Sequence, residues 1–103
     1  MEVMKMETRE QILRRDFSNE FIAKMKNAIE VSHYKYGWCS QTYPELAQAY
    51  KSIKRRLELY EETHNTEYLV DVANFAMIEY KYPSFTNENI SQHEQQKNQD
   101  NWK

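Results

Sequence analysis

One stretch of the chain concentrates residues that could bind an anion. Lys51, Lys54 and Arg55 are spaced three and four residues apart from Lys51, so on a helix they lie on one face. Such cations could bind a phosphate group directly through charge-assisted hydrogen bonds. They could equally form a solvated basic face or pair with the carboxylates of Glu58 and Asp71. The residues leave both interpretations open.

The remaining reactive side chains have a spacing that is typical of structural or surface roles. His33, His64 and His93 do not have the spacing of metal ligands. Cys39 has no activating neighbour in the sequence, so it is expected to be a bystander thiol and not a nucleophile. Asn74 could hydrogen-bond a nucleotide or a neighbouring helix, and both alternatives stay open.

Aromatic residues gather around the single glycine of the chain, Gly37. They are Tyr34, Tyr36, Trp38 and Tyr43. The rings of Trp38 and Tyr36 could stack on a nucleobase, but packing between helix ends is the expected role of this group.

The elements that position these residues are predicted to be helices. One glycine and two prolines in 103 residues leave few tight turns, which argues against an all-β fold. The spacing of apolar residues predicts an all-α chain with three main helices near residues 18–36, 43–62 and 66–81. Thr42 followed by Pro44 and Glu45 predicts the start of the second of them.

The chain length predicts one helical domain with a short segment on either side. An N-terminal arm is expected at residues 1–17, where Thr8 and Gln11 fit a capping box. The domain is expected at residues 18–85. A polar, disordered or weakly helical tail is expected at residues 86–103, with Trp102 as an isolated apolar residue that could dock on a partner.

The third predicted helix is apolar around almost its whole circumference. A helix of this kind needs packing partners on several sides, and two other helices cannot enclose it fully. We therefore expect an antiparallel bundle of three main helices that is completed by oligomerisation, most simply as a homodimer.

Composition excludes several classes of protein. A formal charge of −2 argues against general nucleic-acid binding. No apolar run is long enough to cross a bilayer, so no membrane association is expected. A single cysteine allows no internal disulfide, which favours a cytoplasmic location.

Two segments resemble the MazG-like family of nucleotide pyrophosphohydrolases. They are Gly37-Trp38 and the run from Tyr68 to Met77, within a pattern that covers residues 18–83. The resemblance implies an all-α, oligomeric protein that uses magnesium to convert nucleoside triphosphates into monophosphates and pyrophosphate. Family members carry Glu-Glu-x-x-Glu on the second helix and Glu-x-x-Asp on the third.

This chain departs from that motif at most of its positions. The resemblance puts Lys54 and Arg55 where the first two glutamates belong and Tyr68 where the next belongs, and it keeps Glu58 and Asp71. The expected remnant site therefore consists of Lys54, Arg55, Glu58, Asp71 and Asn74. It has no catalytic residue, metal ligand or cofactor, and magnesium enters only if residual hydrolase activity exists.

The resemblance and its failure together predict a catalytically degenerate, phage-encoded protein. It would act in the host cytoplasm as a binding or inhibitor module towards a host protein or a defence factor. One alternative is a nucleotide-binding module that uses the remnant site between the second and third helices. The other is a residual magnesium-dependent pyrophosphohydrolase.

Overall fold

The computed structural model describes residues 6–85, and within them it contains helices and no strands. This confirms the predicted all-α class for that part of the chain, and none of its helices is long and apolar enough to cross a membrane. The predicted tail and Trp102 lie outside the described residues. The helices are α1 Arg9–Asp16, α2 Asn19–Tyr36, α3 Cys39–Thr42, α4 Ala49–Thr63 and α5 Glu67–Lys81.

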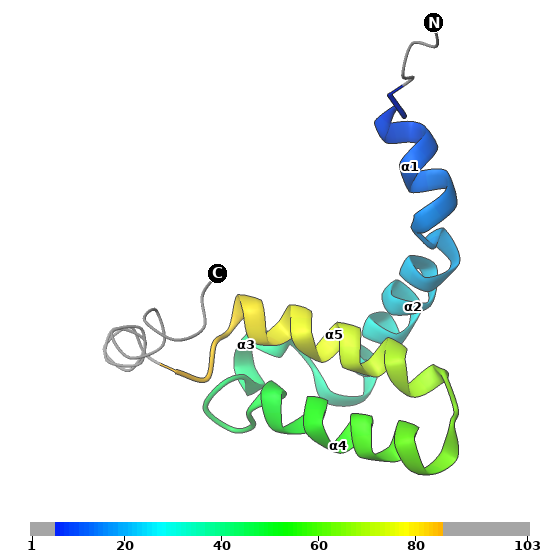
Figure 1. Cartoon of the computed structure of the whole chain (residues 1–103). Coiled ribbons are helices and arrows are strands. Elements are labelled where there is room, and N and C mark those ends of the chain that lie inside the picture. Colours follow the sequence, from blue (N-terminus) through cyan, green and yellow to red (C-terminus); the bar gives the residue numbers. More distant parts are fainter. Residues whose placement is uncertain (1–5, 86–103) are drawn as a thin grey trace, which may run out of the picture.

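The helices form a hairpin that a third helix crosses. α4 and α5 lie side by side and antiparallel, and α2 packs against α5 (Figure 1). α1 and the first part of α2 extend away from this hairpin as an arm (Figure 1). The arm begins with the predicted capping box, because Thr8 Oγ1 accepts from the amide of Gln11 and Gln11 Oε1 accepts from the amide of Thr8. No side chain of α1 is buried.

The ends of α2 agree with the sequence prediction. Ser18 caps its start, since Ser18 Oγ accepts a hydrogen bond of 2.9 Å from the amide of Phe21. Gly37 follows its last residue with a φ of 84°, a conformation that glycine adopts without steric cost. Tyr36 at the end of α2 and Trp38 just after Gly37 therefore lie at the same end of this helix.

The predicted start of the second main helix is wrong. α4 begins at Ala49 and not near residue 43, and residues 43–48 form a loop. Thr42 ends the short α3, and its carbonyl accepts hydrogen bonds from the amides of Leu46 and Ala47, at 2.8 and 3.1 Å. These bonds close a turn, and the extended backbone of Tyr43 before Pro44 is incompatible with a helix there.

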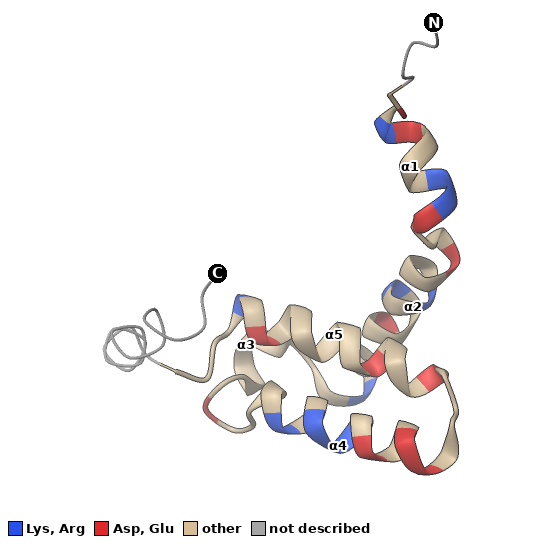
Figure 2. Cartoon of the chain, viewed as in Figure 1, with Lys and Arg blue, Asp and Glu red and all other residues tan. Residues whose placement is uncertain are grey.

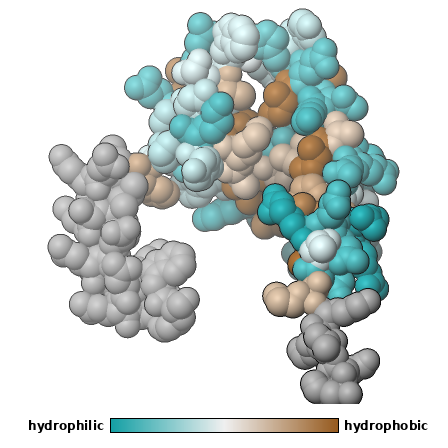
Figure 3. All heavy atoms as spheres, turned by 90° about the horizontal axis from the view of Figure 1, so that it is seen from above, coloured by the Kyte–Doolittle hydropathy of each residue, from teal (hydrophilic) through white to brown (hydrophobic). Residues whose placement is uncertain are grey.

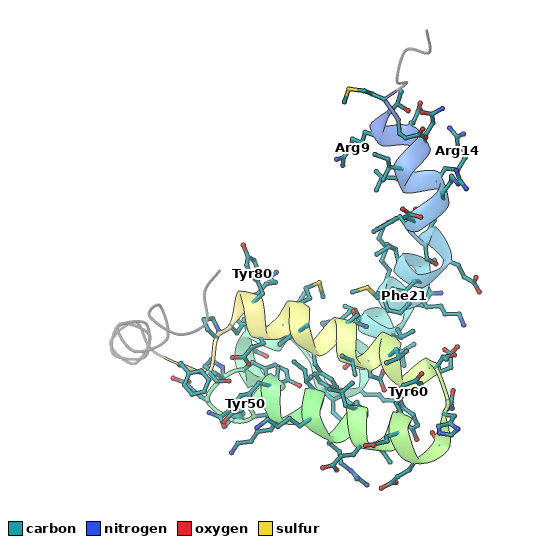
Figure 4. All side chains as sticks on the ribbon, in the orientation of Figure 1. Arg9, Arg14, Phe21, Tyr50, Tyr60 and Tyr80 are labelled. Atoms are coloured by element: carbon teal, nitrogen blue, oxygen red, sulfur yellow. The ribbon has the colours of Figure 1, made fainter. Side chains whose placement is uncertain are left out.

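Glu79 of α5 supplies the contact at the start of α4 that the sequence prediction assigned to Thr42. The N-cap residue of α4, Gln48, makes no side-chain capping bond. Instead Glu79 Oε1 accepts a hydrogen bond of 3.2 Å from the amide of Tyr50. Tyr50 lies in the first turn of α4 (Figure 4). Glu79 also accepts from the amide and the hydroxyl of Ser84, at 2.7 and 2.8 Å. One carboxylate thus joins the start of α4 to the end of α5 and the segment after it.

The core of the described chain is small. Its buried apolar side chains are Ala49, Val70 and Ile78. The rest of α5 is less well covered: Ala76 is exposed and Met77 is 38% exposed. Figure 3 views the molecule from the α5 side, and hydrophobic residues reach the surface there (Figure 3).

Candidate functional site

An ion pair between α4 and α5 involves Asp71, one residue of the predicted site. Arg56 Nε donates a hydrogen bond of 3.1 Å to Asp71 Oδ2. The guanidinium carbon of Arg56 also lies 5.5 Å from the centre of the Phe75 ring, within the range of a cation–π contact. The side chains of Arg56 and Asp71 are 33% and 40% exposed, so the pair is partly shielded from water.

The predicted grouping of Lys54, Arg55 and Glu58 with Asp71 needs correction. These three residues are exposed on α4, whose first part carries basic residues and whose last part carries acidic residues (Figure 2). Arg55 Nη1 pairs with Glu58 Oε1 at 3.1 Å along the same helix, and Lys54 Nζ lies 5.4 Å from the centre of the Tyr50 ring. Arg56, one residue after Arg55, is the α4 cation that contacts Asp71, whereas Arg55 pairs with Glu58, which is one of the roles left open for it.

A pattern in the sequence could have identified Arg56. Arg56 lies three residues after Ile53 and four before Tyr60, which are both half-buried on the face of α4 that packs on α5. A cation within an apolar stripe must either pair or be exposed. Glu79 had no comparable signal, because its partner Tyr50 is 29 residues away.

Asn74 connects α5 to α2. Its side chain is 6% exposed, and Asn74 Nδ2 donates a hydrogen bond of 3.1 Å to the carbonyl of Met25. Of the two roles open for Asn74, contact with a neighbouring helix is therefore the one observed. Its other polar atom, Oδ1, is buried without a hydrogen-bond partner among the described residues.

Within residues 6–85, no three side chains of His, Cys, Asp or Glu come close enough together to hold a metal ion. Glu67 and Asp71, one turn apart on α5, line one pocket between α5 and α2. Glu67 is paired there with a cation, since its Oε2 lies 2.6 Å from Lys24 Nζ of α2. The hydrogen bond and charge of Glu67 raise the pKa of Lys24 above its usual range. This surface ion pair links the start of α5 to α2.

A cleft opens where α2, α4 and α5 meet, beside the Arg56–Asp71 pair. Its volume is about 490 Å³. Its polar lining includes Arg56 and Asp71 from the hairpin and Asn27, Lys35 and Tyr36 from α2. We call this the three-helix cleft. Of the predicted site residues, the cleft contains Asp71 and Tyr36. Its basic residues, Arg56 and Lys35, were not among those predicted.

Trp38 belongs to a different pocket. This pocket, of about 360 Å³, lies between the C-terminal ends of α2 and α5 and the loop that joins α2 to α3. The ring centre of His33 is 4.3 Å from that of Trp38, so His33 has a packing role, as predicted. Trp38 itself is 64% exposed and Tyr34 is 78% exposed. The two predicted stacking residues, Trp38 and Tyr36, therefore do not share one site.

Comparison with known proteins adds no assignment. No family model matches the chain, and no curated protein or solved structure matches it. The resemblance to the MazG-like family thus stays a prediction that rests on the residues of the chain.

Proposed function

We propose that this chain is a non-catalytic binding protein built on a MazG-like scaffold that no longer holds magnesium. The observation that carries the proposal is the contact between Arg56 and Asp71, at 3.1 Å. The resemblance assigns Asp71 to the metal-binding aspartate of the family, and here its carboxylate contacts a guanidinium. In this proposal Arg56 provides the positive charge beside Asp71, so Asp71 has a structural role.

Electrostatics supports this proposal. Magnesium takes six oxygen ligands in near-ideal octahedral geometry, usually with one or two carboxylates. Asp71 offers one carboxylate, and two unit charges about 4 Å apart interact by roughly 4 kcal/mol at an effective dielectric of about 20. A divalent ion would meet repulsion of at least that order from Arg56. The exposed Glu58 is held by Arg55 on the other side of α4 and does not compensate.

A hydrolysis assay tests the loss of catalysis. We expect no magnesium-dependent release of pyrophosphate from any standard nucleoside or deoxynucleoside triphosphate. The double variant Lys54→Glu/Arg55→Glu should gain no affinity for manganese, because both side chains lie on the solvent face of α4. Hydrolysis by the wild-type chain that disappears in Asp71→Asn would overturn the proposal.

The exposed aromatic residues support a protein as the binding partner. Trp38 and Tyr34 are large, exposed, and adjacent to a pocket that an apolar side chain could fill. Tryptophan and tyrosine are enriched among residues that contribute most to protein–protein affinity. We infer that this end of the molecule docks on its target, which for a phage-encoded chain would be a host protein or a defence factor.

Capture from a host lysate with matched variants tests the docking. Trp38→Ala should reduce recovery of a specific protein by at least about tenfold, since a central aromatic anchor contributes about 2 kcal/mol or more. Phe17→Ala is the control, because Phe17 is an aromatic residue that is 51% exposed in the arm and does not line this pocket. Equal recovery with wild type and Trp38→Ala would reject this surface.

We also propose that a second copy of the chain covers the uncovered side of α5. A groove of about 370 Å³ between α2 and α5 is lined by Ile22, Met25, Ile29 and Met77 together with Lys26 and Asn74. A homodimer would bury the apolar side chains that line this groove. The proposal continues the prediction made from the apolar circumference of the third helix.

A further inference from the structure

We propose that the exposed face of α4 binds the same face of a second copy of the chain, with the two helices antiparallel, through charge complementarity. This face carries three cations followed by three anions: Lys51, Lys54, Arg55, Glu58, Glu61 and Glu62. We call this set the α4 charge strip. The contact is separate from the pocket beside Trp38 and from the groove between α2 and α5, and it depends on neither.

The α4 charge strip is accessible to a partner. All six of its side chains are exposed. Around the helix axis, at about 100° per residue, four of its members fall within about 60° of one another: Lys51, Arg55, Glu58 and Glu62. The other side of the helix carries Ala49, which is buried, and Arg56, which contacts Asp71 of α5. The strip therefore lies on the side of α4 that the hairpin does not use.

The order of charges in α4 opposes the helix dipole. α1, α2 and α5 each have an acidic residue in the first turn and a basic residue in the last turn, whereas α4 has neither. The dipole favours anions near the start of a helix and cations near its end. In α4 the basic residues come first and the acidic residues follow (Figure 2). This order does not stabilise the helix that carries it.

Neighbouring charges within the strip also repel one another. Lys51 lies three and four residues before the other two cations, and Glu58 lies three and four residues before the other two anions. Like charges at these spacings destabilise a helix. Within residues 6–85, the ion pair inside the strip joins Arg55 to Glu58, whose side chains are still 55% and 62% exposed. A partner with the opposite charge over each half of the strip would relieve both repulsions.

A second copy in antiparallel orientation presents this complementary order. A two-fold axis midway between residues 56 and 57 places Arg55 opposite Glu58 of the second copy and Lys51 opposite its Glu62, and symmetry repeats both pairs. A polyanion fits less well, because the acidic half of the strip begins within about 10 Å of the basic half along the helix. That separation is comparable with the screening length of about 10 Å at 0.1 M salt, so the polyanion would be repelled there.

Charge reversal in the Ala76→Arg chain tests the inference, because that background removes the proposed homodimer through α5. If that homodimer does not exist, the background has no effect and the test still measures the strip. Exposed ion pairs are individually weak, so sedimentation equilibrium is measured at about 0.5 mM protein and about 20 mM salt. Lys51→Glu/Arg55→Glu and Glu58→Lys/Glu62→Lys should each weaken self-association at least about tenfold, because most of the strip then has one sign. An equimolar mixture of the two variants should associate again.

The control is Arg9→Glu/Arg14→Glu, which changes the net charge of the chain by the same amount on exposed positions of α1. It should change self-association by less than about twofold. Far-UV circular dichroism would confirm that every variant keeps its helices. Raising the salt to about 0.5 M should weaken self-association of the parent chain at least about tenfold, since exposed charges are then screened.

The fourfold variant Lys51→Glu/Arg55→Glu/Glu58→Lys/Glu62→Lys separates complementarity from any single contact. It exchanges the charges while keeping them complementary, so self-association should return to within about threefold of the parent. Its charge order agrees with the helix dipole, so its Tm should not fall. The inference is overturned if the parent does not self-associate, if the double variants associate like the parent, or if their mixture or the fourfold variant stays dissociated. Tighter binding of the parent to a short DNA duplex than to itself would also overturn it.

Discussion

Ala76→Arg is expected to convert the proposed homodimer into a folded monomer. Ala76 is exposed on α5, next to Met77 of the groove between α2 and α5. An arginine there meets solvent in the single chain, so the helices should still form. In the dimer the charge would be buried against the second copy, and burial of an unpaired charge is strongly unfavourable. Because Ala76 is exposed, dissociation of the dimer and not unfolding is the expected result.

The dimer should weaken by at least about 100-fold, because a symmetric interface would bury the new charge twice. Light scattering and sedimentation at micromolar concentrations would measure the change, and far-UV circular dichroism would confirm the helices. Glu61→Arg is a suitable control, since it places an arginine on the exposed face of α4. A wild-type chain that is already monomeric at these concentrations would contradict the assembly, and so would an unchanged dimer of Ala76→Arg.

Glu79→Ala is expected to lower the free energy of unfolding by about 2–4 kcal/mol. The change removes the acceptor for the amide of Tyr50 and for the amide and hydroxyl of Ser84. Each of these donors loses a hydrogen bond to a charged group, which contributes about 1.5–3 kcal/mol, although water can replace part of it. Because a domain of this size is stable by only about 5–15 kcal/mol, the loss is a large fraction of the total.

Urea denaturation followed by circular dichroism would measure this loss. Glu79→Gln should cost less than Glu79→Ala, because the amide keeps one oxygen that can accept from the amide of Tyr50. Glu62→Ala removes a carboxylate from the exposed end of α4, where no hydrogen bond within residues 6–85 depends on it, and should change stability by less than about 0.5 kcal/mol. A loss of stability in Glu79→Ala no larger than in Glu62→Ala would show that Glu79 does not hold the start of α4.

Local chemistry in the sequence was sufficient for features that depend on neighbouring residues. The capping box of Thr8 and Gln11, the start of α2 after Ser18 and its end at Gly37 follow from side chains within four positions. The break between α4 and α5 also lies where it was expected, with His64 in a left-handed conformation. The all-α class followed from the scarcity of glycine and proline. Each of these features is determined by short-range hydrogen bonds and backbone sterics.

Tertiary structure decided every feature that depends on residues far apart in the chain. The start of α4 moved from the local signal at Thr42 to Ala49, where a carboxylate from α5 supplies the cap. The cation beside Asp71 is Arg56 and not Arg55, because a shift of one residue turns a helical side chain by about 100°. Apolar periodicity locates a helix face only within a broad stripe, so it cannot choose between adjacent basic residues. The exposure of Ala76 and the position of Lys35 beside Arg56 likewise depend on how α2 crosses α5, which local sequence does not encode.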